Sequence, residues 1–174
     1  MRIIKDTLLS VSDIPVSDPN FSQALKSAIS LLGRRDCSYS ELREFLSRKS
    51  YPESIVKDTI KYLQQKRLYD EYASAERLAR SKIKKSGIGP LLLEQFLKAK
   101  RFPEHLISDI VSANCSEISE LNLAQQVASK KLSALRNKKN ISNIQIKASL
   151  YRFLAQKGFT AEVCDDIIGK LLDD

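Results

Sequence analysis

The sequence of 174 residues contains no tryptophan, one methionine, and only five glycines and five prolines. So few turn-forming residues argue against a turn-rich β-sandwich. With tryptophan absent and methionine nearly so, the core has to be built from leucine, isoleucine, valine, alanine, phenylalanine and tyrosine. Apolar residues make up 43% of the chain and charged residues 29%, which is typical of a folded protein and not of a disordered one.

Cysteines are few, and long apolar runs are missing. The odd number and wide spacing of Cys37, Cys115 and Cys164 exclude a disulfide framework and a CxxC metal pair, so we expect a reducing cytoplasm. Apolar runs are only a few residues long, as at 90–93, whereas a membrane span needs about 20. No apolar segment follows the N-terminus, so we expect neither a secretory signal nor a membrane partner.

Positive charge is in excess, with 29 lysines and arginines against 21 acidic residues and a net charge of +8. The surplus is spread along the body of the chain and is not concentrated in a basic tail. A surplus of this size favours a polyanionic or acidic partner, although it carries no information about the fold.

A pattern with seven specified positions, L-x-x-F-L-x-x-K-x-[FY]-[PT]-x-x-[ILV], occurs three times. The copies begin at Leu42, Leu93 and Leu150, so the periods are 51 and 57 residues. Leucines four apart, with phenylalanine between them, form one apolar stripe on a helix, and we expect these phenylalanines in the core. The later aromatic residue lies beyond the helix end, where it can fill the turn. The recurrence indicates a duplicated helical unit.

Several residues mark the expected helix boundaries. Pro52 and Pro103 suit the first position of a second helix, and Thr160 suits an N-cap. Capping boxes of the form S-x-x-E and S-x-x-Q begin at Ser38 and Ser142.

The end of the first helix in each pair has its own signal. Gly158 suits the C′ position of a helix. The equivalent positions hold Ser50 and Arg101, so these two turns have to close without glycine.

A further helix precedes each pair, which predicts nine helices in three tandem three-helix repeats. We expect a flexible N-terminal arm at 1–20, followed by repeats at 21–72, 73–118 and 119–174. A three-helix unit of about 50 residues is marginal alone. The repeats should therefore pack end to end into an elongated, curved all-α array.

Four segments carry a family resemblance. The run 40–51 (SELREFLSRKSY) resembles the first-repeat motif of the RecX family of recombination regulators, and 68–73 (LYDEYA) is similar to its acidic-aromatic-alanine signature. The segment 87–90 (GIGP) and the segment 155–159 (AQKGF) also resemble the family. The order and spacing of these motifs are specific, and the resemblance covers roughly 21–172.

The resemblance implies three tandem three-helix repeats that bind the RecA filament on single-stranded DNA. It further implies that the protein limits filament extension, ATP hydrolysis, strand exchange and coprotease activity, in DNA repair, recombination and the SOS response. No catalytic residue, cofactor or metal ligand is carried over from the family. Only the general idea of a basic, concave binding face is transferred.

Basic residues cluster near the ends of the expected helices, in the second and third copies above all. Lysine and arginine favour helix C-termini because of the helix dipole, but the recurrence and the surplus charge favour binding of phosphates or of an acidic protein groove. The candidate RecA- or DNA-binding surface comprises Arg77, Arg80, Lys82, Lys84, Lys85, Lys98, Lys100, Arg101, Lys130, Lys131, Arg136, Lys138 and Lys139.

Nothing in the sequence indicates an enzyme. The only histidine, His105, has no ordered partner in the sequence. The pair Gly87-x-Gly89 lacks a preceding strand and a third glycine, and no P-loop occurs. The cysteines near apolar stripes are typical of structural thiols. We therefore expect no catalysis, no cofactor and no metal.

Two other functions fit the same residues. An independent DNA-binding helical-repeat protein would bind DNA without RecA and with a steep salt dependence. A neutral scaffold for another protein's helix would be insensitive to charge reversal. No long heptad seam is visible, so we expect a monomer.

Overall fold

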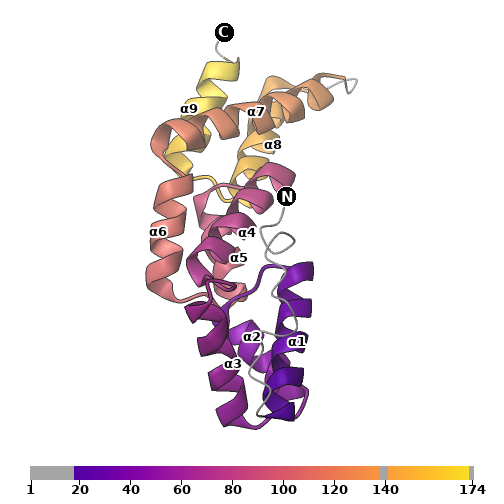
Figure 1. Ribbon diagram of the computed structural model, residues 1–174. Coiled ribbons are helices and arrows are strands. Elements are labelled where there is room, and N and C mark those ends of the chain that lie inside the picture. Colours follow the sequence, from indigo (N-terminus) through magenta and orange to yellow (C-terminus); the bar gives the residue numbers. More distant parts are fainter. Residues whose placement is uncertain (1–17, 138–140, 173–174) are drawn as a thin grey trace. The chain divides into compact units, whose positions relative to one another are not determined.

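The computed structural model describes residues 18–137 and 141–172, without the side chains of residues 117 and 118. The described residues are all-α and form nine helices with no strand, as predicted (Figure 1). The helices are α1 (Pro19–Arg34), α2 (Tyr39–Arg48), α3 (Glu53–Gln65), α4 (Glu71–Ser86), α5 (Pro90–Ala99), α6 (Glu104–Asn114), α7 (Glu117–Arg136), α8 (Asn143–Gln156) and α9 (Ala161–Leu172). None of the described helices has the length and apolar character that a membrane crossing requires.

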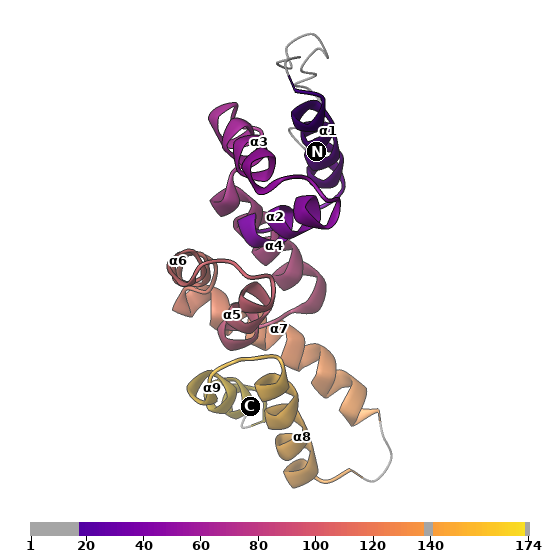
Figure 2. The same ribbon diagram turned by 90° about the horizontal axis from the view of Figure 1, so that it is seen from below.

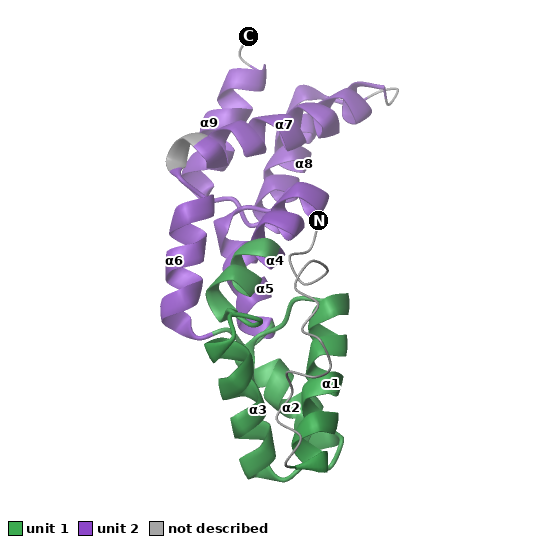
Figure 3. Ribbon diagram, viewed as in Figure 1, with its two compact units in different colours: residues 1–77, 100–102 green, residues 78–99, 103–174 purple. Residues whose placement is uncertain are grey.

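The described chain divides into two compact units (Figure 3). Unit 1 comprises 18–77 and 100–102, and unit 2 comprises 78–99 and 103–172. The boundary falls inside α4, so the second expected repeat contributes to both units. The exact boundaries of the three repeats stay a prediction. Helix α1 begins at Pro19, inside the segment 1–20 that was expected to be a flexible arm. Residues 1–17 lie outside the described part, so the arm stays a prediction.

The core of unit 1 is made by α1, α2 and α3, which all pack against one another (Figure 1; Figure 2). Both leucines of the first pattern copy, Leu42 and Leu46, are fully buried, together with Leu25 and Leu63. Burying one such side chain stabilises the fold by about 1.5–3 kcal/mol. The apolar stripe read from the sequence is thus the surface that holds this bundle together.

In unit 2, α7, α8 and α9 pack against one another, and α5 packs on α6. The pattern leucines Leu93, Leu97, Leu150 and Leu154 are fully buried. The pattern phenylalanines, expected in the core, lie at its edge: Phe45 and Phe153 pack against the cores of their units.

All three pattern phenylalanines are only partly buried. A lysine lies over each ring, with Lys49 Nζ 5.5 Å from the centre of Phe45 and Lys82 Nζ 5.2 Å from that of Phe96. One face of each ring therefore packs inward while the other attracts a cation.

The prolines end up one position earlier than predicted. Pro52 and Pro103 are the N-caps of α3 and α6, not their first residues. Their ψ angles of 146° and 148° keep them outside the helix. Their carbonyls accept the first helical hydrogen bonds, from the amides of Val56 and Ile107. The fixed φ of proline suits either position, and the extended ψ decides between them.

The two turns that were predicted to close without glycine have the same left-handed backbone conformation as the turn at Gly158. Ser50, Arg101 and Gly158 have φ angles of 62°, 58° and 82°, so all three adopt the left-handed conformation. At the end of α8, the amide of Gly158 donates to Ala155 and that of Phe159 to Leu154, which is the Schellman pattern. The repeat therefore conserves a backbone shape that its residues do not all favour.

Candidate functional site

In unit 1, the turn at 100–102 lies on α2 and is held by charge. Lys100 Nζ is 3.2 Å from Glu41 Oε1, and Arg101 donates to Glu44 Oε2 at 2.6 Å. Glu41 was expected to complete a capping box with Ser38. Only half of that box forms: the Ser38 hydroxyl accepts from the Glu41 amide at 3.1 Å, while the Glu41 carboxylate faces Lys100 and Arg35 instead.

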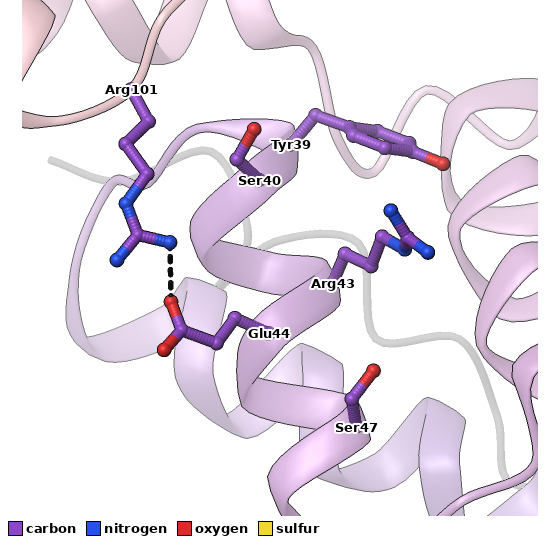
Figure 4. Close-up of a pocket in the computed structure, with 6 residues that line it drawn as sticks. All are labelled: Tyr39, Ser40, Arg43, Glu44, Ser47 and Arg101. Atoms are coloured by element: carbon purple, nitrogen blue, oxygen red, sulfur yellow. Dashed lines mark hydrogen bonds and ion pairs between the residues drawn. The ribbon is translucent and has the colours of Figure 1, made fainter.

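A hollow of about 400 Å³ lies beside this contact (Figure 4). Its lining residues are Tyr39, Ser40, Arg43, Glu44, Ser47 and Arg101. Both of its arginines have an acidic partner, because Arg43 donates to Glu53 at 2.8 Å and Arg101 to Glu44. The hollow is therefore electrically compensated and lacks the unpaired charge that would draw an anion into it.

Four residues of the predicted basic surface are ion-paired within the chain. Besides Lys100 and Arg101, Arg77 NH2 lies 2.7 Å from Asp36 Oδ1. Lys98 Nζ lies 2.8 Å from Glu104 and 2.7 Å from Glu94, and these hydrogen bonds raise the pKa of Lys98. These four cations already have acidic partners and would have to give them up to bind an external anion.

Two further residues of the predicted surface lie over aromatic rings of unit 2. Lys82 covers Phe96, and Lys131 Nζ is 5.4 Å from the centre of Phe153. The structure adds a lysine that the sequence did not single out as a site. Lys157 Nζ lies 5.7 Å from the same Phe153 ring and donates to the Ser86 carbonyl at 2.5 Å. In the sequence, Lys157 is the lysine of the third pattern copy, and only tertiary packing shows what surrounds it.

A third group of cations is exposed. Within the described part of the chain, no ion pair engages Lys84, Lys85, Lys130 or Arg136. Arg80 is also exposed but has a partner in the structure. Lys138 and Lys139 lie outside the described residues.

Helices α4 and α7 of unit 2 approach each other near three of the exposed cations. A Cβ added at Gly87, which ends α4 with φ +55°, would lie 2.7 Å from Val127 Cγ1 of α7. Lys84 and Lys85 lie within one turn of this contact in the sequence, and Lys130 lies within one turn on the other helix. We call Lys84, Lys85, Lys130 and Arg136 the unpaired basic set.

The glycines of the Gly87-x-Gly89 pair serve packing and not nucleotide binding. The amide of Gly89 donates to the Lys157 carbonyl at 2.8 Å, and that of Leu91 to the Gly158 carbonyl at 3.1 Å. A Cβ at Gly89 would meet the Gly158 oxygen at 2.6 Å. Two backbones therefore meet here at a distance that only glycine allows.

The acidic-aromatic segment after α3 is also structural. Tyr69 is buried and donates to the Cys37 carbonyl at 3.2 Å, and burial raises the pKa of Tyr69. Asp70 accepts from the Ala73 amide at 3.0 Å and thereby caps α4. Glu71 instead accepts from the Tyr39 amide at 2.7 Å at the start of α2.

The thiols are poorly suited to nucleophilic chemistry. Burial raises the pKa of Cys37 and of Cys115 to about 11 and also raises the pKa of Cys164, so all three stay protonated at neutral pH. Cys115 is half-buried and not fully buried. Among the described residues, no cluster of His, Cys, Asp or Glu could hold a metal ion.

Comparison with known proteins points to one family. The profile described as the first three-helix domain of RecX matches residues 24–63, and that of the third three-helix domain of RecX matches residues 118–168. Regulatory protein RecX of Clostridium perfringens (strain SM101) is 26% identical over 174 residues, covering 99% of this chain and 80% of the relative. Regulatory protein RecX of Chlorobium phaeobacteroides (strain BS1) is 30% identical over 144 residues, covering 83% and 90%.

The fold is similar to solved structures of the same name. The crystal structure of RecX from Lactobacillus salivarius matches with a TM-score of 0.77 at 19% identity, covering 87% of this chain and 96% of that chain. At this level of identity the likeness establishes the fold alone.

Proposed function

The chain belongs to the RecX family, and from this premise we propose that it binds the RecA filament on single-stranded DNA and limits its activity. The activities concerned are filament extension, ATP hydrolysis, strand exchange and coprotease action, in DNA repair, recombination and the SOS response. Members of the family are regulatory proteins and not enzymes. Regulation by this chain therefore has to come from binding.

The unpaired basic set is the observation on this chain that supports the proposal. The single-stranded DNA of the filament carries phosphates, and exposed cations without internal partners gain most from contact with negative charge. The ion-paired residues Arg77, Lys98, Lys100 and Arg101 would first have to break their contacts. We therefore place the main contact on the α4 and α7 segments of unit 2.

Inhibition requires a preference for the assembled filament. A ligand shifts an equilibrium only by its differential affinity for the two states. A chain that contacts adjacent RecA protomers binds the filament more tightly than free subunits and obstructs addition of the next protomer. Equal affinity for RecA monomer and filament in a pull-down would contradict this mechanism.

The test is ATP hydrolysis by RecA on single-stranded DNA, titrated with this chain below one molecule per protomer. The wild type should inhibit at substoichiometric ratios. The double variant Lys84→Glu/Lys130→Glu removes two members of the unpaired basic set and should need at least tenfold more protein for the same inhibition.

The matched control is Lys26→Glu/Lys61→Glu, which changes the net charge equally at two exposed lysines of unit 1. It should inhibit like the wild type. If both double variants lose inhibition to the same extent, inhibition depends on the net charge of the chain and not on the α4 and α7 surface.

Independent DNA binding, the alternative function, predicts a different outcome of the same titration. The wild type would then leave ATP hydrolysis unchanged and would shift bare single-stranded DNA in a gel. Loss of that shift in Lys84→Glu/Lys130→Glu, without any effect on RecA, would move the assignment to a DNA-binding protein.

A further inference from the structure

The outer face of α8 carries an apolar stripe. Ile144, Ala148, Tyr151 and Ala155 are all exposed, with 82% of Ile144 and 37% of Tyr151 accessible to solvent. They are spaced by four, three and four residues, which places them on one face of the helix. Their opposite face packs into the core through Ile146, Leu150 and Leu154. The stripe is therefore additional to the apolar surface that folds the chain.

The equivalent faces of the other two repeats are more polar. On α2, the positions of Ala148, Tyr151 and Ala155 hold Ser40, Arg43 and Ser47, and Arg43 is paired with Glu53. On α5, they hold Leu91, Glu94 and Lys98, and the last two form an ion pair. A continuous apolar stripe is thus particular to the third repeat.

The stripe begins in a turn that only α8 has. Helix α8 starts seven residues before its first pattern leucine, whereas α2 and α5 start three residues before theirs. This added turn contributes Ile144 and is closed by a full capping box. The Gln145 amide donates to the Ser142 hydroxyl, and the Gln145 side chain accepts from the Ser142 amide at 3.0 Å.

On α5, by contrast, the amides at the helix start bond the turn that precedes α9. At the start of α8 the capping box already supplies hydrogen-bond partners within the helix. A further repeat could therefore not bind there through the backbone hydrogen bonds that the start of α5 makes. The stripe requires another kind of occupant.

We propose that this stripe is a docking site for an acidic amphipathic helix of a partner protein. Helix α8 contains no acidic residue, and the exposed Lys147 and Arg152 lie on either side of the stripe. A partner helix with an apolar face and acidic flanks would bury the stripe and pair with both cations. The small side chains of Ala148, between Ile144 and Tyr151, and of Ala155, beyond Tyr151, let such a helix approach closely.

A protein helix fits this surface better than a nucleic acid does. The most exposed member of the stripe is an isoleucine, which offers a base no aromatic face for stacking. The inference is independent of the RecA proposal, because it concerns α8 and not the unpaired basic set.

The test is fluorescence anisotropy of the full-length chain with a labelled synthetic 21-residue helical peptide. The peptide has leucine at the a and d positions of each heptad and glutamate beside them. A peptide with lysine in place of every glutamate is the comparison. We expect the chain to bind the glutamate peptide at least tenfold more tightly than the lysine peptide.

Two sets of variants locate the site. Ile144→Ser and Tyr151→Ser should each weaken binding of the glutamate peptide at least tenfold, since each removes a large apolar side chain that the bound peptide would bury. Leu91→Ser is the matched control, because Leu91 is a half-exposed apolar residue of α5, and it should change binding less than twofold. Lys147→Glu/Arg152→Glu should weaken binding of the glutamate peptide and strengthen binding of the lysine peptide.

Three results would overturn the proposal: equal affinity for both peptides, an equal loss in Leu91→Ser and Ile144→Ser, or unchanged peptide binding in Ile144→Ser. If Ile144→Ser and Tyr151→Ser instead weaken only the binding of single-stranded DNA, the stripe belongs to a nucleic-acid surface and helix docking is excluded. Failure of the RecA titration would leave these peptide results unaffected, so the two proposals can fail separately.

Discussion

Ser50 and Arg101 hold a left-handed backbone that L-residues disfavour, at a cost of about 1–2 kcal/mol each. Glycine takes this conformation freely but loses more chain entropy on folding, by about 0.5–1 kcal/mol. Ser50 is exposed, and its side chain therefore contributes little packing that would be lost. We expect Ser50→Gly to raise the free energy of unfolding by about 0.5–1 kcal/mol, measured by urea denaturation.

Ser47 supplies the control for this change, because it is an exposed residue inside α2. Ser47→Gly should lower the free energy of unfolding by about 0.5 kcal/mol, since glycine is a poor helix former. The same substitution three residues apart should therefore have opposite signs. A loss of stability in both variants would contradict the role of the left-handed turn.

Glu120 is a residue whose charge opposes folding. Burial raises the pKa of its carboxyl, and a hydrogen bond from the Thr160 amide at 3.4 Å only partly offsets this. Its contribution is most favourable below the ordinary carboxyl pKa of about 4.3 and is lost as pH rises through the raised value.

We expect Glu120→Gln to stabilise the chain at pH 7 and to lose that advantage as pH falls toward 4, followed as Tm against pH. Glu162→Gln is the control, because Glu162 is exposed in the first turn of α9. That variant should show no gain at pH 7. A pH-independent difference between Glu120→Gln and the wild type would refute the assignment to desolvation.

At the scale of elements, the start of α5 and the turn before α9 form one closely packed contact. The Gly89 and Gly158 backbones are too close to admit a Cβ at Gly89 without a shift of the backbone. Gly89→Ala should destabilise the fold by about 1–3 kcal/mol, as overpacking does elsewhere. Thermal unfolding followed by circular dichroism measures the change.

Gly33 is the matched control for that substitution. It lies near the end of α1, and a Cβ there would meet nothing within 4 Å. Gly33→Ala should be neutral or stabilise by up to about 1 kcal/mol, because alanine is the better helix former. A fall in Tm as large as that of Gly89→Ala would show that helix α1, too, depends on its glycine.

The corresponding contact in unit 1 uses charge instead. Lys100 and Arg101 bind Glu41 and Glu44 of α2, where the other contact uses backbone hydrogen bonds between glycines. Duplicated repeats therefore share their buried leucines while their contacts with the next element differ in chemistry.

At the scale of the whole molecule, the net charge of +8 overstates the cations that are available to a partner. Binding of single-stranded DNA gives a slope of log affinity against log salt near −0.7 per phosphate neutralised. If the unpaired basic set makes the contacts, the slope should be about −3. If all thirteen predicted cations took part, it would be about −9.

Titrations of a fluorescent oligonucleotide at several salt concentrations measure this slope. Lys26→Glu/Lys61→Glu should leave the slope unchanged, whereas Lys84→Glu/Lys130→Glu should reduce its magnitude by about 1.4. A slope near −9 would mean that the ion pairs of unit 1 and α5 open on binding.

Helices, their stripes and most of their caps could be predicted because each depends on residues close in the chain. Leucines four apart fall on one face whatever surrounds them, and the Ser142 box formed as expected. The box at Ser38 formed only in part, because the carboxylate of Glu41 binds Lys100, which is 59 residues away in the sequence. No local pattern contains that competition.

The sequence alone determined the all-α class, the repeat of helix pairs and the family, because periodicity and capping act over a few residues. Tertiary structure decided which cations are paired, which glycines admit no side chain and which apolar residues stay exposed. Ile144 and Ile146 are alike and two positions apart, yet only Ile146 is buried. The difference lies in which face of α8 meets α7 and α9, and charge and burial at such positions depend on neighbours that are distant in the chain.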